Sequence, residues 1–190
     1  MVEQSDLLKY ALNVLEQLEI PYAIVGSFAC GVWGESRFTQ DIDILLNLRS
    51  DLIAPLCAEF PPPHFCVSNI AAREAVARSG HFNVLHPSSG NKIDFMIADE
   101  RSWTGAQLDR RIMVPLFPDQ PAAFAAPEDV ILGKLVYFRQ GGSDKHLRDI
   151  AGILQFSGEL IDFDYLRQQT RLLGLDKIWE SIVAKSNNDN

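Results

Sequence analysis

The segment Asp41-Ile42-Asp43-Ile44-Leu45-Leu46 alternates charged and apolar residues at its start, and no other pattern in the chain constrains the fold as strongly. Successive side chains of a strand point to opposite faces, so the two aspartates share one face and the two isoleucines the other. Two carboxylates held side by side repel each other unless a cation lies between them. A divalent ion such as Mg²⁺, which prefers carboxylate oxygens, is a natural partner. The alternative is the solvated face of an edge strand, where charges block unwanted pairing.

A short apolar run, Tyr22-Ala23-Ile24-Val25, precedes this strand and stops at Gly26-Ser27. We interpret the run as a buried strand that enters a tight turn, followed by a short helix over residues 28–33. Backbone N–H groups and a hydroxyl at such a helix start can bind phosphate oxygens, although Gly-Ser is also an ordinary turn. A third carboxylate, Asp94, lies in the strand-like run 92–97. If that strand lies beside the first, three carboxylates converge on one or two metal ions.

The remaining patterns predict an α+β fold: a small mixed β-sheet with helices, followed by a helical C-terminal third. Apolar residues at helical spacing predict helices over 5–19, 51–59 and 71–78. Short apolar runs bounded by turn residues predict strands over 22–25, 41–46, 82–85, 92–97 and 111–117. We expect the strands 82–85 and 92–97 to form a hairpin. Pro127 with two acids in a first turn predicts a helix that ends near Gly141, and further helices follow at 144–156, 162–172 and 174–185. We expect an α/β core over 1–126, a helical subdomain over 127–186 and a polar tail over 187–190.

These segments together resemble the DNA polymerase β-type nucleotidyltransferase superfamily, in particular its small prokaryotic, toxin-like members related to AbiEii. The resemblance rests on Val25-Gly26-Ser27, on Asp41-Ile42-Asp43-Ile44 and on Asp94. The run 31–40 and the helical segments 127–135 and 144–150 are also similar to motifs of that group. The resemblance covers residues 20–175, except that 51–80 matches no assignable part. It implies that the core over 1–126 has the nucleotidyltransferase fold.

The resemblance also implies an activity: Mg²⁺-dependent transfer of a nucleoside monophosphate from a nucleoside triphosphate (NTP) to an acceptor hydroxyl. Asp41, Asp43 and Asp94 would bind two Mg²⁺ ions, or Mn²⁺, and Asp94 would help to deprotonate the attacking hydroxyl. Gly26 and Ser27 would hold the β- and γ-phosphates. Two ions about 3.5–4 Å apart stabilise the attacking and leaving oxygens of such a displacement.

Four further residues are candidates for nucleotide binding: Arg37, Thr39, Lys134 and Lys145. Arg37 lies just before the aspartate strand, and Lys134 lies among apolar residues of its helix, where a lysine needs a partner. Each has a structural alternative: a surface ion pair for Arg37, a surface lysine for Lys134, and a cap on the local backbone for Thr39. In the resembling toxins a helix that bears Lys and Asp lines the cleft, which implies that Lys145 and Asp149 face the nucleotide. The structural alternative for Lys145 is a solvent-exposed helix stabilised by ion pairs between side chains four residues apart.

Composition limits the partners and the location of the protein. The chain has 17 Lys and Arg against 25 Asp and Glu, a net charge of -8, which argues against non-specific duplex DNA binding because that depends on neutralising phosphates. The longest apolar runs are about ten residues, too short for a membrane span. Residues 1–6 are acidic and polar, without the pattern of a signal peptide, so we expect a cytoplasmic protein. The three cysteines lack CxxC spacing, which predicts reduced, structural thiols.

The acceptor stays open among a protein, a tRNA and a small molecule, and a toxin–antitoxin role with an antitoxin or partner protein is part of the expectation. A second class of function is a catalytically inactive nucleotide-binding or interaction module with the same fold. All three aspartates are present, whereas a degenerate copy would typically have lost a metal ligand. A third class, a glycosyltransferase that uses the two aspartates for metal binding, usually needs a larger nucleotide-binding domain before them.

Overall fold

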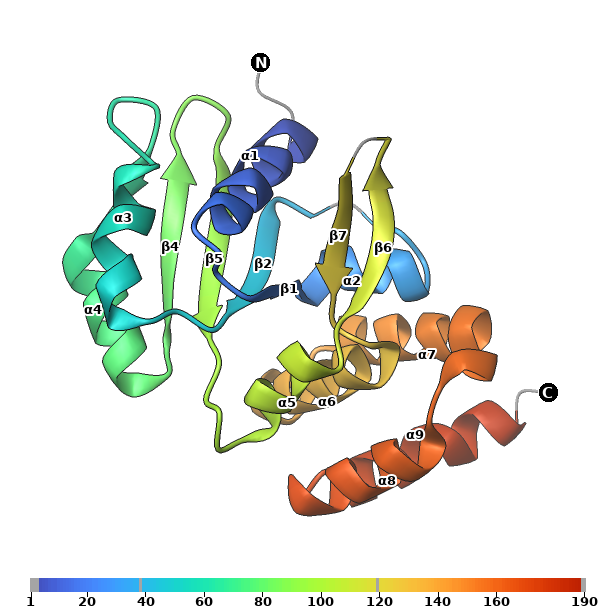
Figure 1. The fold of residues 1–190 in the computed structure, drawn as a ribbon. Coiled ribbons are helices and arrows are strands. Elements are labelled where there is room, and N and C mark those ends of the chain that lie inside the picture. Colours follow the sequence, from blue (N-terminus) through green and yellow to red (C-terminus); the bar gives the residue numbers. More distant parts are fainter. Residues whose placement is uncertain (1–3, 38, 119, 189–190) are drawn as a thin grey trace. The chain divides into compact units, whose positions relative to one another are not determined.

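The computed structural model describes residues 4–37, 39–118 and 120–188 (Figure 1). By its internal contacts the chain divides into two compact units. The first contains the residues up to Ser27 together with 38–125, and the second contains 28–37 together with the residues from Ala126 onwards. The segment 28–37 therefore belongs with the C-terminal helices, although in the sequence it lies between two strands of the first unit.

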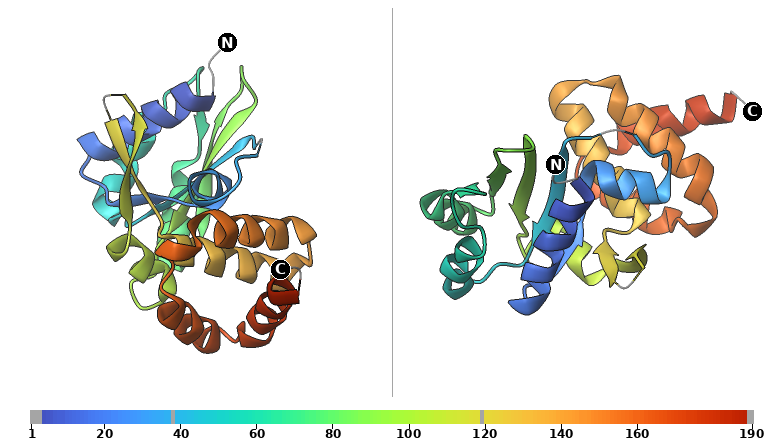
Figure 2. Two further views of the ribbon diagram at one scale, coloured as in Figure 1. Left: turned by 90° about the vertical axis from the view of Figure 1, so that its right-hand side faces the viewer. Right: turned by 90° about the horizontal axis from the view of Figure 1, so that it is seen from above.

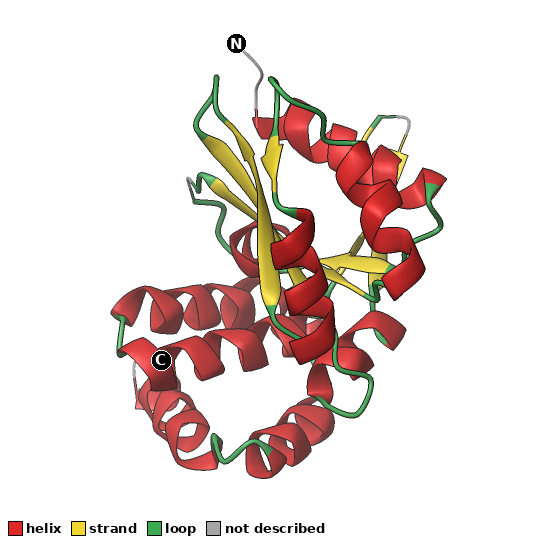
Figure 3. Ribbon diagram, turned by 90° about the vertical axis from the view of Figure 1, so that its left-hand side faces the viewer, coloured by secondary structure: helices red, strands yellow, loops and turns green. Residues whose placement is uncertain are grey.

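The first unit is built on a seven-stranded mixed sheet with the strand order β3-β4-β5-β2-β1-β7-β6, drawn in yellow in Figure 3. Its strands are β1 (Tyr22–Ile24), β2 (Asp41–Leu46), β3 (Cys66–Val67), β4 (His81–His86), β5 (Asn91–Ile97), β6 (Ile112–Phe117) and β7 (Gln120–Phe124). The pairs β2–β5 and β1–β7 are parallel, and the other neighbours are antiparallel. The predicted strands and the β4–β5 hairpin are confirmed, whereas β3 and β7 were not predicted.

Among its described residues the first unit also has four helices, α1 (Gln4–Gln17), α3 (Ile53–Ala58), α4 (Asn69–Arg78) and α5 (Trp103–Asp109), with a 3-10 turn η1 (Ser50–Leu52) before α3. Helix α1 contacts residues near both ends of the sheet. Tyr10 stacks on Phe65, the residue before β3, with 5.4 Å between ring centroids. Asn13 accepts a hydrogen bond of 2.9 Å from Gln120 of β7. Helices α3 and α4 pack together beside β4 (Figure 2). The short helix α5 was not predicted.

Burial alternates along the paired strands β2 and β5, and this alternation exposes a polar face. The side chains of one face are fully buried: Ile42, Ile44, Ile93 and Phe95. The intervening side chains on the other face are exposed or partly exposed: Asp41, Asp43, Lys92 and Asp94. The sheet thus presents three carboxylates and one ammonium on a rigid surface whose back is anchored in the core.

The described elements of the second unit are helices: α2 (Gly26–Trp33) from Phe28 on, α6 (Pro127–Gly141), α7 (Asp144–Ser157), α8 (Phe163–Leu172) and α9 (Asp176–Asn188), with a 3-10 turn η2 (Gly158–Leu160). Helix α6 begins at Pro127 and stops where Gly142 adopts a left-handed conformation with φ of 64°. Helix α6 packs against α7 and α8, and α8 packs against α9. The helical C-terminal third is confirmed, and residues 189–190 of the predicted polar tail lie outside the described residues.

No helix in the described part of the chain combines the length and the apolar character that a membrane crossing requires.

Candidate functional site

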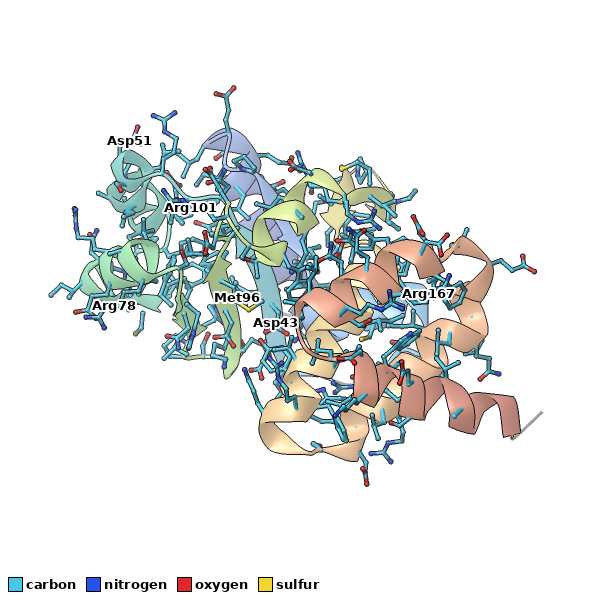
Figure 4. The ribbon with its side chains drawn as sticks, turned by 90° about the horizontal axis from the view of Figure 1, so that it is seen from below. Asp43, Asp51, Arg78, Met96, Arg101 and Arg167 are labelled. Atoms are coloured by element: carbon cyan, nitrogen blue, oxygen red, sulfur yellow. The ribbon has the colours of Figure 1, made fainter. Side chains whose placement is uncertain are left out.

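The three predicted metal ligands lie on two neighbouring strands. In the parallel pairing of β2 and β5, Asp41 lies opposite Lys92 and Asp43 lies opposite Asp94. Side chains of directly opposed residues emerge on the same face of a sheet, so these four residues form one group, which we call the acidic cluster. Figure 4 shows Asp43 on β2 beside β5, the strand that carries Met96.

Lys92 was not predicted as a site residue, yet it contacts two of the three aspartates. Its Nζ lies 2.7 Å from Asp94 Oδ2 and 3.4 Å from Asp41 Oδ1. The hydrogen bond to Asp94, with the charges of both carboxylates, raises the pKa of the Lys92 ammonium above its usual value despite partial burial. The signal was present in Lys92-Ile93-Asp94, because residues two apart in a strand share a face.

Gly26 lies directly against Asp43. Its φ of +63° is in the left-handed region that favours glycine, and a Cβ there would lie 2.0 Å from Asp43 Oδ2 and 2.9 Å from Asp43 Cβ. Val25 N also donates a 3.0 Å hydrogen bond to the backbone oxygen of Asp43, which ties this turn to β2. Ser27 follows as the second residue of α2 and is partly exposed. The predicted phosphate-binding turn is therefore adjacent to a predicted metal ligand.

The donor chemistry of the acidic cluster suits Mg²⁺, because carboxylate oxygens are its preferred protein ligands. The side chains are nevertheless arranged around an ammonium: Asp41 and Asp94 both contact Lys92. Within residues 4–37, 39–118 and 120–188, no three His, Cys, Asp or Glu side chains are grouped so as to hold a metal ion. The metal-binding role of the three aspartates therefore stays a prediction.

Thr39 interacts with the backbone at the start of β2. Its Oγ1 accepts a hydrogen bond of 3.3 Å from Asp41 N and lies 3.2 Å from the Asp41 carbonyl oxygen. These contacts correspond to the local cap considered as the alternative for this residue. A role of Thr39 in nucleotide binding stays a prediction.

The second unit contains a charged group of the opposite composition, Arg37, Lys134 and Asp149, which we call the basic cluster. Asp149 of α7 accepts hydrogen bonds of 2.7 Å from Lys134 Nζ of α6 and of 3.1 Å from Arg37 Nε. The side chains of Lys134 and Asp149 are only 6% and 8% exposed, whereas that of Arg37 is 37% exposed. Lys134 is therefore a buried ion-pair partner rather than a surface lysine. Lys145, four residues before Asp149, is exposed.

Burial and charge shift the titration of the groups around Asp149. Burial raises the pKa of Asp149, but the contacts with Lys134 and Arg37 outweigh it and hold this pKa below its usual value. Burial, with the charge of Lys134, lowers the pKa of His146. Burial raises the pKa of the Cys30 thiol to about 11, so this thiol stays protonated at neutral pH. All three cysteines are free thiols.

Several solved structures resemble this chain at low sequence identity. The antibiotic-resistance factor ANT(2'')-Ia superposes with a TM-score of 0.56 at 14% identity, over 98% of this chain and 96% of its own. The lincosamide antibiotic adenylyltransferase LnuA, bound to lincomycin, gives 0.53 at 14% identity, over 80% and 96%. An antigenic nucleotidyltransferase-like protein from Paracoccidioides brasiliensis gives 0.51 at 20% identity, over 78% and 74%.

These likenesses establish that the chain has the nucleotidyltransferase fold. Comparison of the sequence with protein-family models and with curated proteins gave no match. The shared fold by itself does not transfer an activity, which depends on the residues at the site.

Proposed function

We propose that this chain, which has the fold of the nucleotidyltransferases, transfers a nucleoside monophosphate from an NTP to an acceptor hydroxyl. One observation carries the proposal: Asp43 of β2 lies directly opposite Asp94 of β5, and Gly26 at the start of α2 packs against the Asp43 carboxylate. A turn that can bind phosphate thus adjoins carboxylates that can bind a divalent cation.

Five candidate residues of the first unit then have distinct roles. Gly26 and Ser27 would bind phosphate oxygens through backbone N–H groups and the serine hydroxyl. Asp41, Asp43 and Asp94 would hold Mg²⁺, which when bound neutralises the phosphates and stabilises the attacking and leaving oxygens. Asp94 would accept the proton of the acceptor hydroxyl while the hydroxyl oxygen forms a bond to the α-phosphorus. The bond from the α-phosphorus to the bridging oxygen breaks, and pyrophosphate leaves.

A small hydroxylated molecule is the first acceptor to test, and ATP is the first nucleotide. ANT(2'')-Ia has been solved in complex with adenylyl-2''-tobramycin, and LnuA has been solved with lincomycin. Both structures thus show a small molecule bound to a protein of this fold. A tRNA or protein acceptor, an AbiEii-like toxin–antitoxin role, and nucleotide contacts from Arg37, Lys134 and Lys145 stay predictions.

The decisive experiment uses α-labelled NTPs, Mg²⁺ and either a cell extract or a panel of hydroxylated small molecules, followed by identification of the labelled product. Asp43→Asn should reduce labelling by more than about 100-fold, as expected when a group that stabilises transition-state charge is lost, and should leave the fold intact. Asp51→Asn is the matched control, because Asp51 is 60% exposed and pairs only with its neighbour Arg49 in the ion pairs of the described residues. Equal labelling by the Asp43→Asn variant and the wild type would remove Asp43 from the metal site.

The inactive module remains a second candidate, favoured by the present arrangement of Asp41 and Asp94 around an ammonium. Binding of Mg²⁺ and an NTP should stabilise the folded protein by about 2.7 kcal/mol at a ligand concentration of one hundred times Kd. A rise in melting temperature without transfer would identify an inactive nucleotide-binding module. No rise with any NTP at millimolar concentration would favour an interaction module.

A further inference from the structure

Lys92 lies on the same sheet face as the three aspartates and contacts two of them. It lies directly opposite Asp41 across the β2–β5 pair and two residues before Asp94 on its own strand. Its ammonium contacts both carboxylates, at 3.4 Å and 2.7 Å. One lysine thus joins the two strands that carry the predicted metal ligands.

The register of the strands explains why a cation is needed there. Asp43 and Asp94 are directly opposed, and like charges in that position destabilise a sheet. The ammonium of Lys92 compensates part of this repulsion through Asp94. In the ion pairs of the described residues, Lys92 is the cation that contacts Asp41 and Asp94. If Lys92 were removed and no metal ion were bound, these ion pairs would be lost.

The same contacts are open to exchange. The side chains of Lys92, Asp94 and Asp41 are 30%, 19% and 54% exposed, so each can be rehydrated when the pair separates. Lysine carries its charge on a flexible four-carbon chain, so the ammonium can move into solvent without movement of the strand. Accessible ion pairs of this kind contribute little to folding stability.

We propose that Lys92 is an exchangeable counter-ion that occupies the carboxylates of the free protein and is displaced when a divalent cation binds. Lys92 is then a positioning residue that holds Asp41 and Asp94 on the sheet surface and lowers the affinity for a metal ion alone. This inference rests on the proposed function, because it takes Asp41, Asp43 and Asp94 as the ligands of the cation.

The test measures Mn²⁺ binding to the full chain without nucleotide, from the electron paramagnetic resonance signal of the free ion. Lys92→Met should bind Mn²⁺ roughly 10-fold more tightly than the wild type, because one screened unit charge no longer competes with the ion. Lys92→Arg keeps the charge and should match the wild type. Lys177→Met, which removes an exposed lysine of α9, controls for the general loss of positive charge.

The outcomes separate this inference from the proposed function. Mn²⁺ binding that is weakened by Asp43→Asn but equal in Lys92→Met and the wild type would overturn the role of Lys92 and leave the metal site in place. If neither the wild type nor any variant bound Mn²⁺, both the role of Lys92 and the metal site of the proposed function would be overturned. Lys92→Gln serves as a second neutral variant, and circular dichroism with a melting curve in EDTA verifies that each variant is folded.

Discussion

The acidic and basic clusters use the same kinds of charged group in opposite proportion. The acidic cluster has three carboxylates and one ammonium on the face of a sheet. The basic cluster has one carboxylate between an ammonium and a guanidinium on packed helices. The first therefore has a surplus of negative charge that suits a cation, and the second a surplus of positive charge.

Burial separates the two clusters more sharply than charge does. Lys134 and Asp149 are 6% and 8% exposed, whereas Lys92 and Asp41 are 30% and 54% exposed. Separating a buried pair leaves a desolvated charge, which is costly, whereas water can replace the partner of an accessible charge. The comparison indicates that the acidic cluster can change its partners, while the basic cluster holds helices α6 and α7 together.

The largest expected effect is on the basic cluster. Asp149→Asn should destabilise the protein by about 3–5 kcal/mol, because the buried ammonium of Lys134 loses its counter-charge. Asp41→Asn, the matched substitution in the acidic cluster, should cost less than about 1 kcal/mol. Urea unfolding measures both. The double variant Lys134→Met/Asp149→Asn should recover part of the loss, and equal costs for the two single variants would refute the comparison.

A smaller effect is expected at the turn beside the acidic cluster. Gly26→Ala should cost about 2–3 kcal/mol, because the left-handed backbone is unfavourable for alanine and the new Cβ displaces the Asp43 side chain. Gly90→Ala is the matched control: its φ is +73°, and a Cβ added there would have no atom within 4 Å. It should cost about 1–2 kcal/mol from the backbone alone. If urea unfolding gave equal losses of stability for Gly26→Ala and Gly90→Ala, the close approach of Gly26 and Asp43 would add nothing to the cost of the substitution.

The smallest expected effect is a pH dependence near the basic cluster. The pKa of His146 is lowered in the folded state, so the folded protein favours the neutral ring. The stability this provides is complete above the unfolded pKa of about 6.5 and is lost as the pH falls towards the folded pKa. Melting temperatures measured from pH 7.5 to 5 should fall less in His146→Gln than in the wild type. His64→Gln, at an exposed position, should follow the wild type, and a parallel decline in all three proteins would exclude His146 as the cause.

Elements with a strong local pattern were predictable from the sequence. Helix α6 has a proline in its first turn and a glycine after its end, and strand β2 alternates, so both were predicted with the bounds observed. Strand β7 was missed because Gln120-Pro121-Ala122-Ala123-Phe124 has no alternation and contains a proline. The extended form of β7 depends on pairing with two strands: β1, which is distant in sequence, and β6, which a turn joins to β7.

The sequence by itself determined which side chains share a face, because the two-residue period of a strand is a local property. Asp41 with Asp43, and Lys92 with Asp94, are each two residues apart, so their common orientation follows once the strands exist. Only the tertiary structure decided that these two pairs face each other, and that Asp149 reaches Lys134 and Arg37, the latter 112 residues away. Backbone hydrogen bonding is the same for every strand, so the choice of partners depends on the packing of the whole chain.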